Sequence, residues 1–118
     1  MTETRQTRGF LFADLRDYSR FTEHHGDDAA TRLLVRYRSM VRDAVGRFDG
    51  AEIRTEGDSF YVVFASVGSA VHAGLAILDG ARGASAESAD EPIRVGIGIH
   101  AGETIDGEQG IVSSAVNI

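Results

Sequence analysis

The hydrophobic and polar positions change their spacing along the chain. Residues 9–15, GFLFADL, form a short apolar run that closes on an acidic residue, which is typical of a buried strand with a functional residue at its end. From Asp27 onward, apolar positions recur at steps of three and four, which predicts an amphipathic helix. Asp27 is its expected N-cap and Gly50 its expected stop. The apolar positions of this helix are Ala30, Leu33, Leu34, Tyr37, Met40, Val41, Val45 and Phe48.

A hairpin and a second helix are predicted next. The β-branched and aromatic segments 51–55 and 59–65 flank a short Glu-Gly-Asp sequence, so they predict a β-hairpin. Ser66 is the expected cap of the second helix. One face of that helix is expected to consist of Val67, Ala70, Val71, Gly74, Leu75 and Leu78. The small and polar residues 80–92 predict a loop after it.

The last third of the chain predicts one more strand and the start of a further helix. In the strand 93–104, Gly96 and Gly98 leave room for a ligand or for another backbone. Residues 105–110 have the composition of a turn, and residues 113–118 that of a helix start. Because this third helix is cut off, we expect the C-terminal part of the domain to be missing from the sequence.

The order of these elements, β-α-β-β-α-β, predicts an α+β fold of the ferredoxin-like type. In this plan an antiparallel sheet carries its helices on one face. The 118 residues fit one compact domain. We divide the chain into an N-terminal tail, residues 1–8, and a domain over residues 9–118.

Composition and charge narrow the classes of function. The net charge is −6, from 12 basic and 18 acidic residues, and every basic residue is Arg. We therefore expect no nucleic-acid partner and no membrane contact, since a binder of either would present a basic face. The chain has no Cys, no apolar run of membrane-spanning length and no signal-peptide pattern at its N-terminus. These features predict a soluble, cytoplasmic domain.

Two aspartates stand at matching strand ends. Asp14 closes the first strand and Asp58 lies in the hairpin, and these two strands are neighbours in the predicted sheet. Taken singly, Asp14 can serve as a cap and Asp58 as a turn residue. Together the two carboxylates repel each other unless a cation lies between them. Mg²⁺ suits this position, because it binds one or two carboxylates together with substrate phosphates.

Four segments in order resemble the catalytic domain of class III nucleotidyl cyclases, the adenylate and guanylate cyclases. They are FLFADLRDYSRFTE, RTEGDSFYVVFA, IRVGIGIHAGE and SSAVNI, and the resemblance covers nearly the whole chain from Gly9 onward. It implies an enzyme that converts ATP, or alternatively GTP, into the cyclic nucleotide and pyrophosphate. It also implies a homodimer in which both chains build each site.

The resemblance implies two Mg²⁺ or Mn²⁺ ions per site. Their ligands would be Asp14, Asp58 and the backbone carbonyl of Leu15. One ion would lower the pKa of the ribose 3′-hydroxyl for its attack on the α-phosphorus, and the other would hold the β- and γ-phosphates.

The resemblance also implies a phosphate site at the start of a helix. Asp17, Tyr18 and Ser19 follow the first aspartate like the family's phosphate-binding turn. A phosphate-binding Arg that is common on the last strand corresponds here to Gly96. Arg94, two residues earlier, points to the same face and is the expected substitute.

The residues that would read the base depart from the family pattern. The family's purine-reading Lys corresponds to Arg54, and its second base-reading residue corresponds to Gly110, which has no side chain. Asn117 corresponds to the Asn that positions the ribose. The family's transition-state Arg would follow four residues later, beyond Ile118.

These departures keep two alternatives open. One is a non-catalytic cyclase-homology module that dimerises or binds nucleotide in order to regulate a partner. The other is a diguanylate cyclase, but the hairpin of that family carries a second acidic residue where this chain has Ser59.

Overall fold

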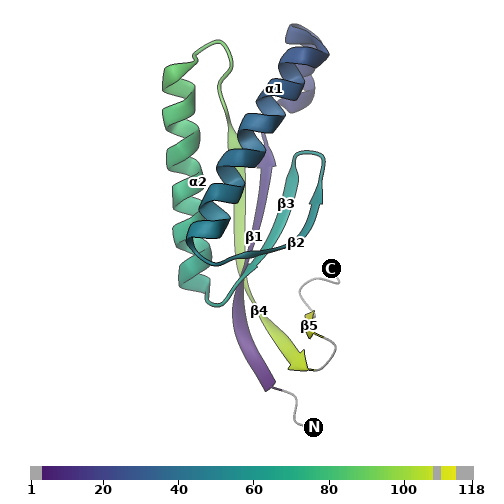
Figure 1. Cartoon of the computed structure of the whole chain (residues 1–118), viewed down its shortest axis with the longest axis vertical. Helices are drawn as coiled ribbons and strands as arrows, with labels where there is room; N and C mark the ends of the chain where they lie inside the picture. The colour runs from purple at the N-terminus through teal and green to yellow at the C-terminus, as the bar shows by residue number, and fades with distance from the viewer. Residues whose placement is uncertain (1–3, 108–109, 114–118) are drawn as a thin grey trace.

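One antiparallel sheet forms the centre of the molecule (Figure 1). The computed structural model describes residues 4–107 and 110–113. Its sheet has five strands in the order β2-β3-β1-β4-β5. The elements in chain order are β1 (Thr4–Leu15), α1 (Tyr18–Arg47), β2 (Ala51–Glu56), β3 (Ser59–Phe64), α2 (Val67–Glu87), β4 (Val95–Gly107) and β5 (Gly110–Ser113). The first four strands and two helices confirm the predicted α+β, ferredoxin-like order.

The side chains of β1 divide the core between the two faces of the sheet. Leu11 and Ala13 belong to the main apolar cluster, which they share with residues of α1 and α2. Phe10 alternates with them and joins Tyr61 and Val63 in a separate cluster. Both helices therefore cover one face, while the other face carries a smaller aromatic cluster.

Strand β1 begins earlier than the apolar pattern predicts. Residues 4–8, expected within a tail, continue β1 and pair with the far half of β4, from Arg8↔Gly102 to Thr4↔Asp106. This ribbon of β1 and β4 extends past the ends of the helices in Figure 1. Its residues are mostly polar, and Thr104 among them is fully buried.

Helix α1 consists of two segments that meet at Gly26. Gly26 has φ 85° and ψ 172°. This is a non-helical backbone conformation that only glycine adopts at low energetic cost. The long helix predicted from residue 27 onward is confirmed as the second segment. The predicted N-cap is wrong by one position, because Gly26 and not Asp27 is the last non-helical residue. The polar residues before Gly26 form the first segment.

The end of α1 corrects the role expected for Gly50. The residue in the left-handed region is Asp49, with φ 56°. The N–H of Gly50 donates to the Val45 carbonyl at 2.9 Å. This bond closes the end of α1. A Cβ at Gly50 would collide with the ring of Phe64, so glycine itself is needed here for close packing.

Helix α2 is longer than predicted. Ser66 caps it as expected, since its Oγ accepts from the Ser69 N–H at 3.0 Å. The helix continues to Glu87, so the loop predicted over residues 80–92 is wrong for its first eight residues. Small residues there allow α2 to lie close to α1. A Cβ added to Gly80 would lie 3.0 Å from Cγ of Met40.

The buried face of α2 also differs from the prediction. The buried residues are small, apart from one Ile: Ala70, Ala73, Gly74, Ile77 and Ala81. Leu75 is 59% exposed, and Val71 and Leu78 are also exposed. The helix can approach the sheet closely on its small residues, which leaves the larger apolar side chains outside.

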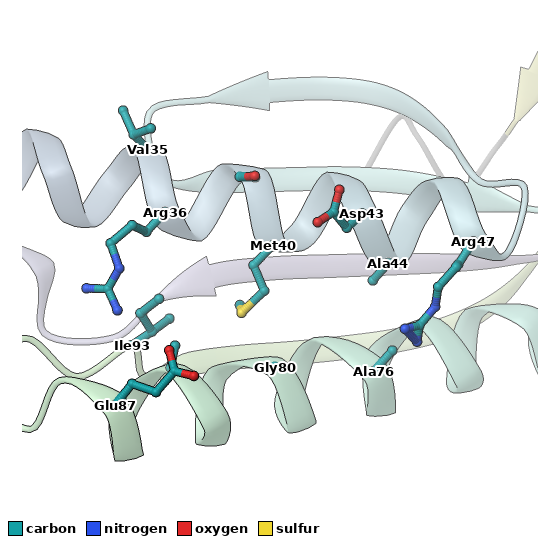
Figure 2. Close-up of a pocket in the computed structure, with 12 residues that line it drawn as sticks. Val35, Arg36, Met40, Asp43, Ala44, Arg47, Ala76, Gly80, Glu87 and Ile93 are labelled. Carbon is teal, nitrogen blue, oxygen red and sulfur yellow. The ribbon is translucent and has the colours of Figure 1, made fainter.

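A groove of ≈ 560 Å³ runs between α1 and α2 (Figure 2). Met40 and Ala44 of α1 face Ala76 and Gly80 of α2 across it. Charged side chains flank these apolar residues; they are Arg36, Asp43, Arg47 and Glu87.

The C-terminal segment pairs as a strand. Strand β4 continues through Gly107, and Gly110 pairs with it in β5. The turn predicted over 105–110 is therefore shorter, and Ser113, the expected helix start, ends β5. Residues 114–118, the rest of the predicted third helix, lie outside the described residues. Within the described ranges, neither helix has the length and hydropathy needed to cross a bilayer.

Candidate active site

The two predicted metal-binding aspartates meet at one end of the sheet. Asp14 is the penultimate residue of β1, and Asp58 is the second residue of the two-residue turn between β2 and β3. The antiparallel register Ala13↔Phe60 brings these ends together. The backbone N–H of Leu15 donates to Asp58 Oδ2 at 3.3 Å. This bond ties the turn that carries Asp58 to the strand end that carries Asp14.

Asp14 holds an unsatisfied oxygen at this point. Its side chain is 43% exposed, yet Oδ1 is buried and has no hydrogen-bond partner among the described residues. Arg16 Nε lies 3.5 Å from Oδ1 as an ion-pair neighbour. A buried carboxylate oxygen without a donor is unfavourable unless a cation or a further group binds it. The donor set therefore fits a hard divalent cation, for which carboxylate oxygens are suitable ligands.

Tyr37 of α1 is fully buried against β3. Burial raises the pKa of its hydroxyl well above the ordinary value, and the negative charges of Asp58 and Asp14 raise it further, whereas Arg38 lowers it. The hydroxyl is buried and has no hydrogen-bond partner within the described ranges. Its ring packs edge-on against Phe60, with centroids 5.6 Å apart.

Two arginines of α1 hold the hairpin that carries Asp58. The guanidinium of Arg38 donates through Nε and Nη2 to the Gly57 carbonyl in the turn. Arg42 Nε donates to Glu52 on β2 at 2.8 Å. Gly57 itself has φ 56°, which glycine adopts without strain. The position of Asp58 is thus set from both the sheet and the helix.

The predicted phosphate residues lie at the start of α1. Asp17 precedes the helix with φ 59°, and Tyr18 and Ser19 are its first two residues. The first N–H groups of a helix have no intrahelical acceptor, so they are available to an anion. Arg94 Nη1 lies 3.7 Å from Asp17 Oδ2. The Tyr18 hydroxyl donates to the Ala30 carbonyl, which ties the two segments of α1 together.

Arg16 occupies the space over Gly96. The two strands bring Asp14 opposite Gly96, and a Cβ on Gly96 would collide with the guanidinium of Arg16. The close approach predicted at Gly96 is therefore made by a side chain of this same chain. A pocket of ≈ 210 Å³ beside it is lined by Arg16, Arg20 and Arg94, among others. This cluster of cations adjoins the first turn of α1.

The predicted base-reading residues are separated within one chain. Arg54 lies on β2 and lines a small pocket of ≈ 240 Å³ with Phe12 and Tyr61. Phe12 is 46% exposed, and its ring centroid lies 4.9 Å from that of Tyr61. Gly110 begins β5, at the opposite edge of the sheet. Asn117 lies outside the described residues.

Three residues of this region carry no signal that the sequence pattern isolates. Arg16 follows the first strand as one of twelve arginines, and only the pairing of β1 with β4 places it over Gly96. Phe12 and Tyr37 occupy apolar positions and are expected to be core residues. The described ranges hold no group of three or more His, Cys, Asp or Glu side chains placed to bind a metal.

The fold and this site define an α+β domain with two acidic residues at one sheet end and, beside them, a pocket lined by three arginines and two aspartates, among others. A sequence model of the adenylate and guanylate cyclase catalytic domain matches residues 2–116. The chain therefore belongs to the family of adenylate and guanylate cyclase catalytic domains, the class III nucleotidyl cyclases. No curated protein sequence matches it significantly.

Solved structures share this fold. A crystal structure of an adenylate/guanylate cyclase/hydrolase from Silicibacter pomeroyi is 26% identical, with TM-score 0.75, over 98% of this chain and 68% of that one. A bacterial light-regulated adenylyl cyclase is 19% identical, with TM-score 0.78, over 97% of this chain. The catalytic core of a rhodopsin-guanylyl cyclase of converted specificity, in complex with ATPαS, is 16% identical, with TM-score 0.73, over 98% of this chain and 70% of that one. The chain spans 37% and 63% of two light-regulated adenylyl cyclase chains.

Proposed function

We propose that the chain is the catalytic part of a nucleotidyl cyclase that converts ATP into cyclic AMP and pyrophosphate. The observation that supports this most directly is the convergence of Asp14 and Asp58, with one carboxylate oxygen buried and lacking a donor. Two like charges at one end of a sheet favour a divalent cation between them. GTP is the second substrate to be tested, because the pocket lined by Phe12 and Tyr61 also holds Arg54, whose planar guanidinium offers several hydrogen-bond donors.

Asp14, Asp58 and the Leu15 carbonyl would hold Mg²⁺ or Mn²⁺. When bound, such ions supply Lewis-acid stabilisation of the negative charge on the reacting phosphate and of the attacking 3′-oxygen. Asp58 is kept in place by the Leu15 N–H, and its turn by Arg38, so these groups orient the carboxylate before any ligand arrives.

The cations beside this site would bind the triphosphate. Arg16 and Arg94 lie at the first turn of α1, whose free N–H groups also favour phosphate. Arg16 is the better candidate for the phosphate-binding role expected of the last strand, because its guanidinium lies over Gly96. Without ligand, Arg16 neutralises part of the negative charge on Asp14. Once a metal ion neutralises that carboxylate instead, Arg16 can turn to the phosphates.

The hollow beside Arg54 would take the purine base. The exposed ring of Phe12 offers a stacking surface, and Arg54 offers a planar set of donors. Arg54 and Gly110 lie on the two edge strands of the sheet. This arrangement supports a homodimer in which each site draws residues from both chains.

The test is cyclic-nucleotide formation by the protein that carries this chain, with Mn²⁺ and either ATP or GTP. Asp14→Ala and Asp58→Ala should each lower turnover by at least about 100-fold, because charge stabilisation worth several kcal/mol is lost. Asp43→Ala, in the groove between the helices, is the matched control and should leave turnover unchanged. Full activity in both active-site variants would refute the metal assignment.

A non-catalytic module is the competing proposal, and the absence of a side chain at Gly110 favours it. Calorimetry with ATP and Mn²⁺ beside the turnover assay separates the two. Binding that depends on Asp14 but yields no product identifies the module.

A further inference from the structure

A hydrogen bond crosses the middle strand of the sheet on the face away from the helices. The Tyr61 hydroxyl on β3 and Nε2 of His100 on β4 lie 3.3 Å apart. Both strands pair with β1, on opposite sides of it. Phe10 of β1 stacks on both rings, with its centroid 5.8 Å from that of Tyr61 and 5.2 Å from that of His100. Phe10 has no exposed surface, so this bridge of two rings helps to bury it.

Tyr61 also belongs to the base pocket, the hollow of ≈ 240 Å³ that it lines with Phe12 and Arg54, among others. The exposed ring of Phe12 is the proposed stacking surface, and it packs against Tyr61 with centroids 4.9 Å apart and planes at 49°. His100 is not one of the residues that line this pocket. The ring of Tyr61 therefore supports Phe12 in the pocket, while its hydroxyl is bonded to His100 outside the pocket.

Packing alone does not account for a histidine at position 100. A phenylalanine there would stack on Phe10 as well, but it could not bond the Tyr61 hydroxyl. Tyr61 is 5% exposed, and a tyrosine hydroxyl at such burial favours a partner within the protein. The imidazole supplies a partner from β4, a strand that is itself held by its long ladder with β1.

We propose that His100 is a positioning residue of the base pocket, which orients Tyr61 through the hydrogen bond and so fixes the Phe12 ring for stacking on the purine. This inference rests on the proposed function, because it requires that the hollow beside Arg54 takes the base. A stacking surface that is already fixed needs no ordering when the ligand binds. Without the bond, Tyr61 and Phe12 are free to rotate, and nucleotide binding is weakened.

The experiment measures nucleoside and nucleotide affinity in the protein that carries this chain. Adenosine lacks the phosphates, so its binding, followed by saturation-transfer NMR, tests the base pocket without a metal ion. His100→Phe should weaken adenosine binding by about fivefold, the effect of one net hydrogen bond. With Mn²⁺ and ATP it should raise KM by a similar factor and leave kcat within about twofold, since it touches no reacting group. His100→Gln, whose amide can again bond the Tyr61 hydroxyl, should recover part of the loss.

Tyr61→Phe removes the same hydrogen bond from its other side and keeps the ring. If the bond carries the effect, the double variant of Tyr61→Phe and His100→Phe should bind adenosine no more weakly than either single variant. His72→Phe is the matched control, because His72 of α2 also packs against an aromatic ring, that of Phe48, with centroids 5.9 Å apart. Its adenosine affinity should remain that of the wild type.

The outcomes separate this inference from the proposed function. If the wild type binds no adenosine, the base pocket fails and the role of His100 fails with it. If the wild type binds adenosine but forms no cyclic nucleotide, the proposed reaction fails, and the adenosine affinities still decide the role of His100. If His100→Phe and Tyr61→Phe both bind adenosine as the wild type does, the pocket stands and the role of His100 is refuted. Should His100→Phe fail to fold, Tyr61→Phe alone decides.

Discussion

The N–H of Leu15 donates to the carboxylate of Asp58, 43 positions further along the chain, and so joins the end of β1 to the turn of the β2–β3 hairpin. The bond predicts that two substitutions of Asp58 differ. Asp58→Asn keeps an oxygen acceptor for Leu15 but loses the charge, so it should fold with nearly wild-type stability and lose the response to Mn²⁺. Asp58→Ala should in addition lose about 1 kcal/mol of unfolding free energy, the usual contribution of one hydrogen bond. Chemical denaturation with and without Mn²⁺ measures both effects, and equal stability of the two variants would show that the bond contributes nothing.

The contact of Arg16 with Gly96 predicts that an arginine placed on β4 can take over the role of Arg16. Arg16→Ala should raise KM for ATP by about tenfold, the effect of losing one charge-assisted hydrogen bond. Adding Gly96→Arg to Arg16→Ala should recover part of the loss, because the new side chain enters the space that the Arg16 guanidinium leaves. Steady-state kinetics over a range of ATP concentrations measures both variants, with Arg47→Ala as a control in the groove between the helices. A double variant no better than Arg16→Ala would contradict the shared position.

Gly83 tests the length of α2. It lies inside the helix, and an added Cβ would meet no atom within 4 Å. Gly83→Ala should therefore raise the unfolding free energy by about 0.5–1 kcal/mol, the difference in helix propensity. Gly83→Pro should lower it by about 3 kcal/mol or more, because proline breaks a helix interior. Thermal unfolding followed by circular dichroism measures the two variants, and indifference to proline would instead support a loop.

Alkaline pH should destabilise the protein through its buried tyrosines. Burial raises the pKa values of Tyr37 and Tyr61 above the ordinary value of 10.0. The unfolded chain therefore loses its tyrosine protons first, so the stability that is present below pH 10 falls as the pH rises further. The slope contributed by one such group reaches about 1.4 kcal/mol per pH unit. Urea denaturation between pH 9 and pH 11 should show this fall, and Tyr37→Phe should show a smaller one. An identical slope in the variant would exclude Tyr37 as its source.

The sequence pattern predicts well the part of the site that lies at the end of the sheet, because the pairing of the strands follows from the order of the elements. Asp14 and Asp58 could be placed together once β1 and the hairpin were expected to be neighbours. The length of α2 could not be predicted from the Gly- and Ser-containing segment after Leu78, because its helical state depends on contact with α1, as at Gly80 and Met40. Periodicity identifies Tyr37 as a core residue, but it cannot show where a hydroxyl points. The place of Arg16 depends on the register between β1 and β4, which no local pattern contains.

The proposed sharing of each site between two chains has a consequence for mixed assemblies. If two chains share their sites across a twofold axis, each chain gives its Asp14 to one site and its Arg54 to the other. A dimer of one Asp14→Ala chain and one Arg54→Ala chain then concentrates both defects in one site and leaves the other intact. Equal mixing makes half of the dimers of this kind, so two inactive proteins together should regain about one quarter of the activity of the wild type. Such complementation would count the chains in a working site without any knowledge of the segments that follow β5.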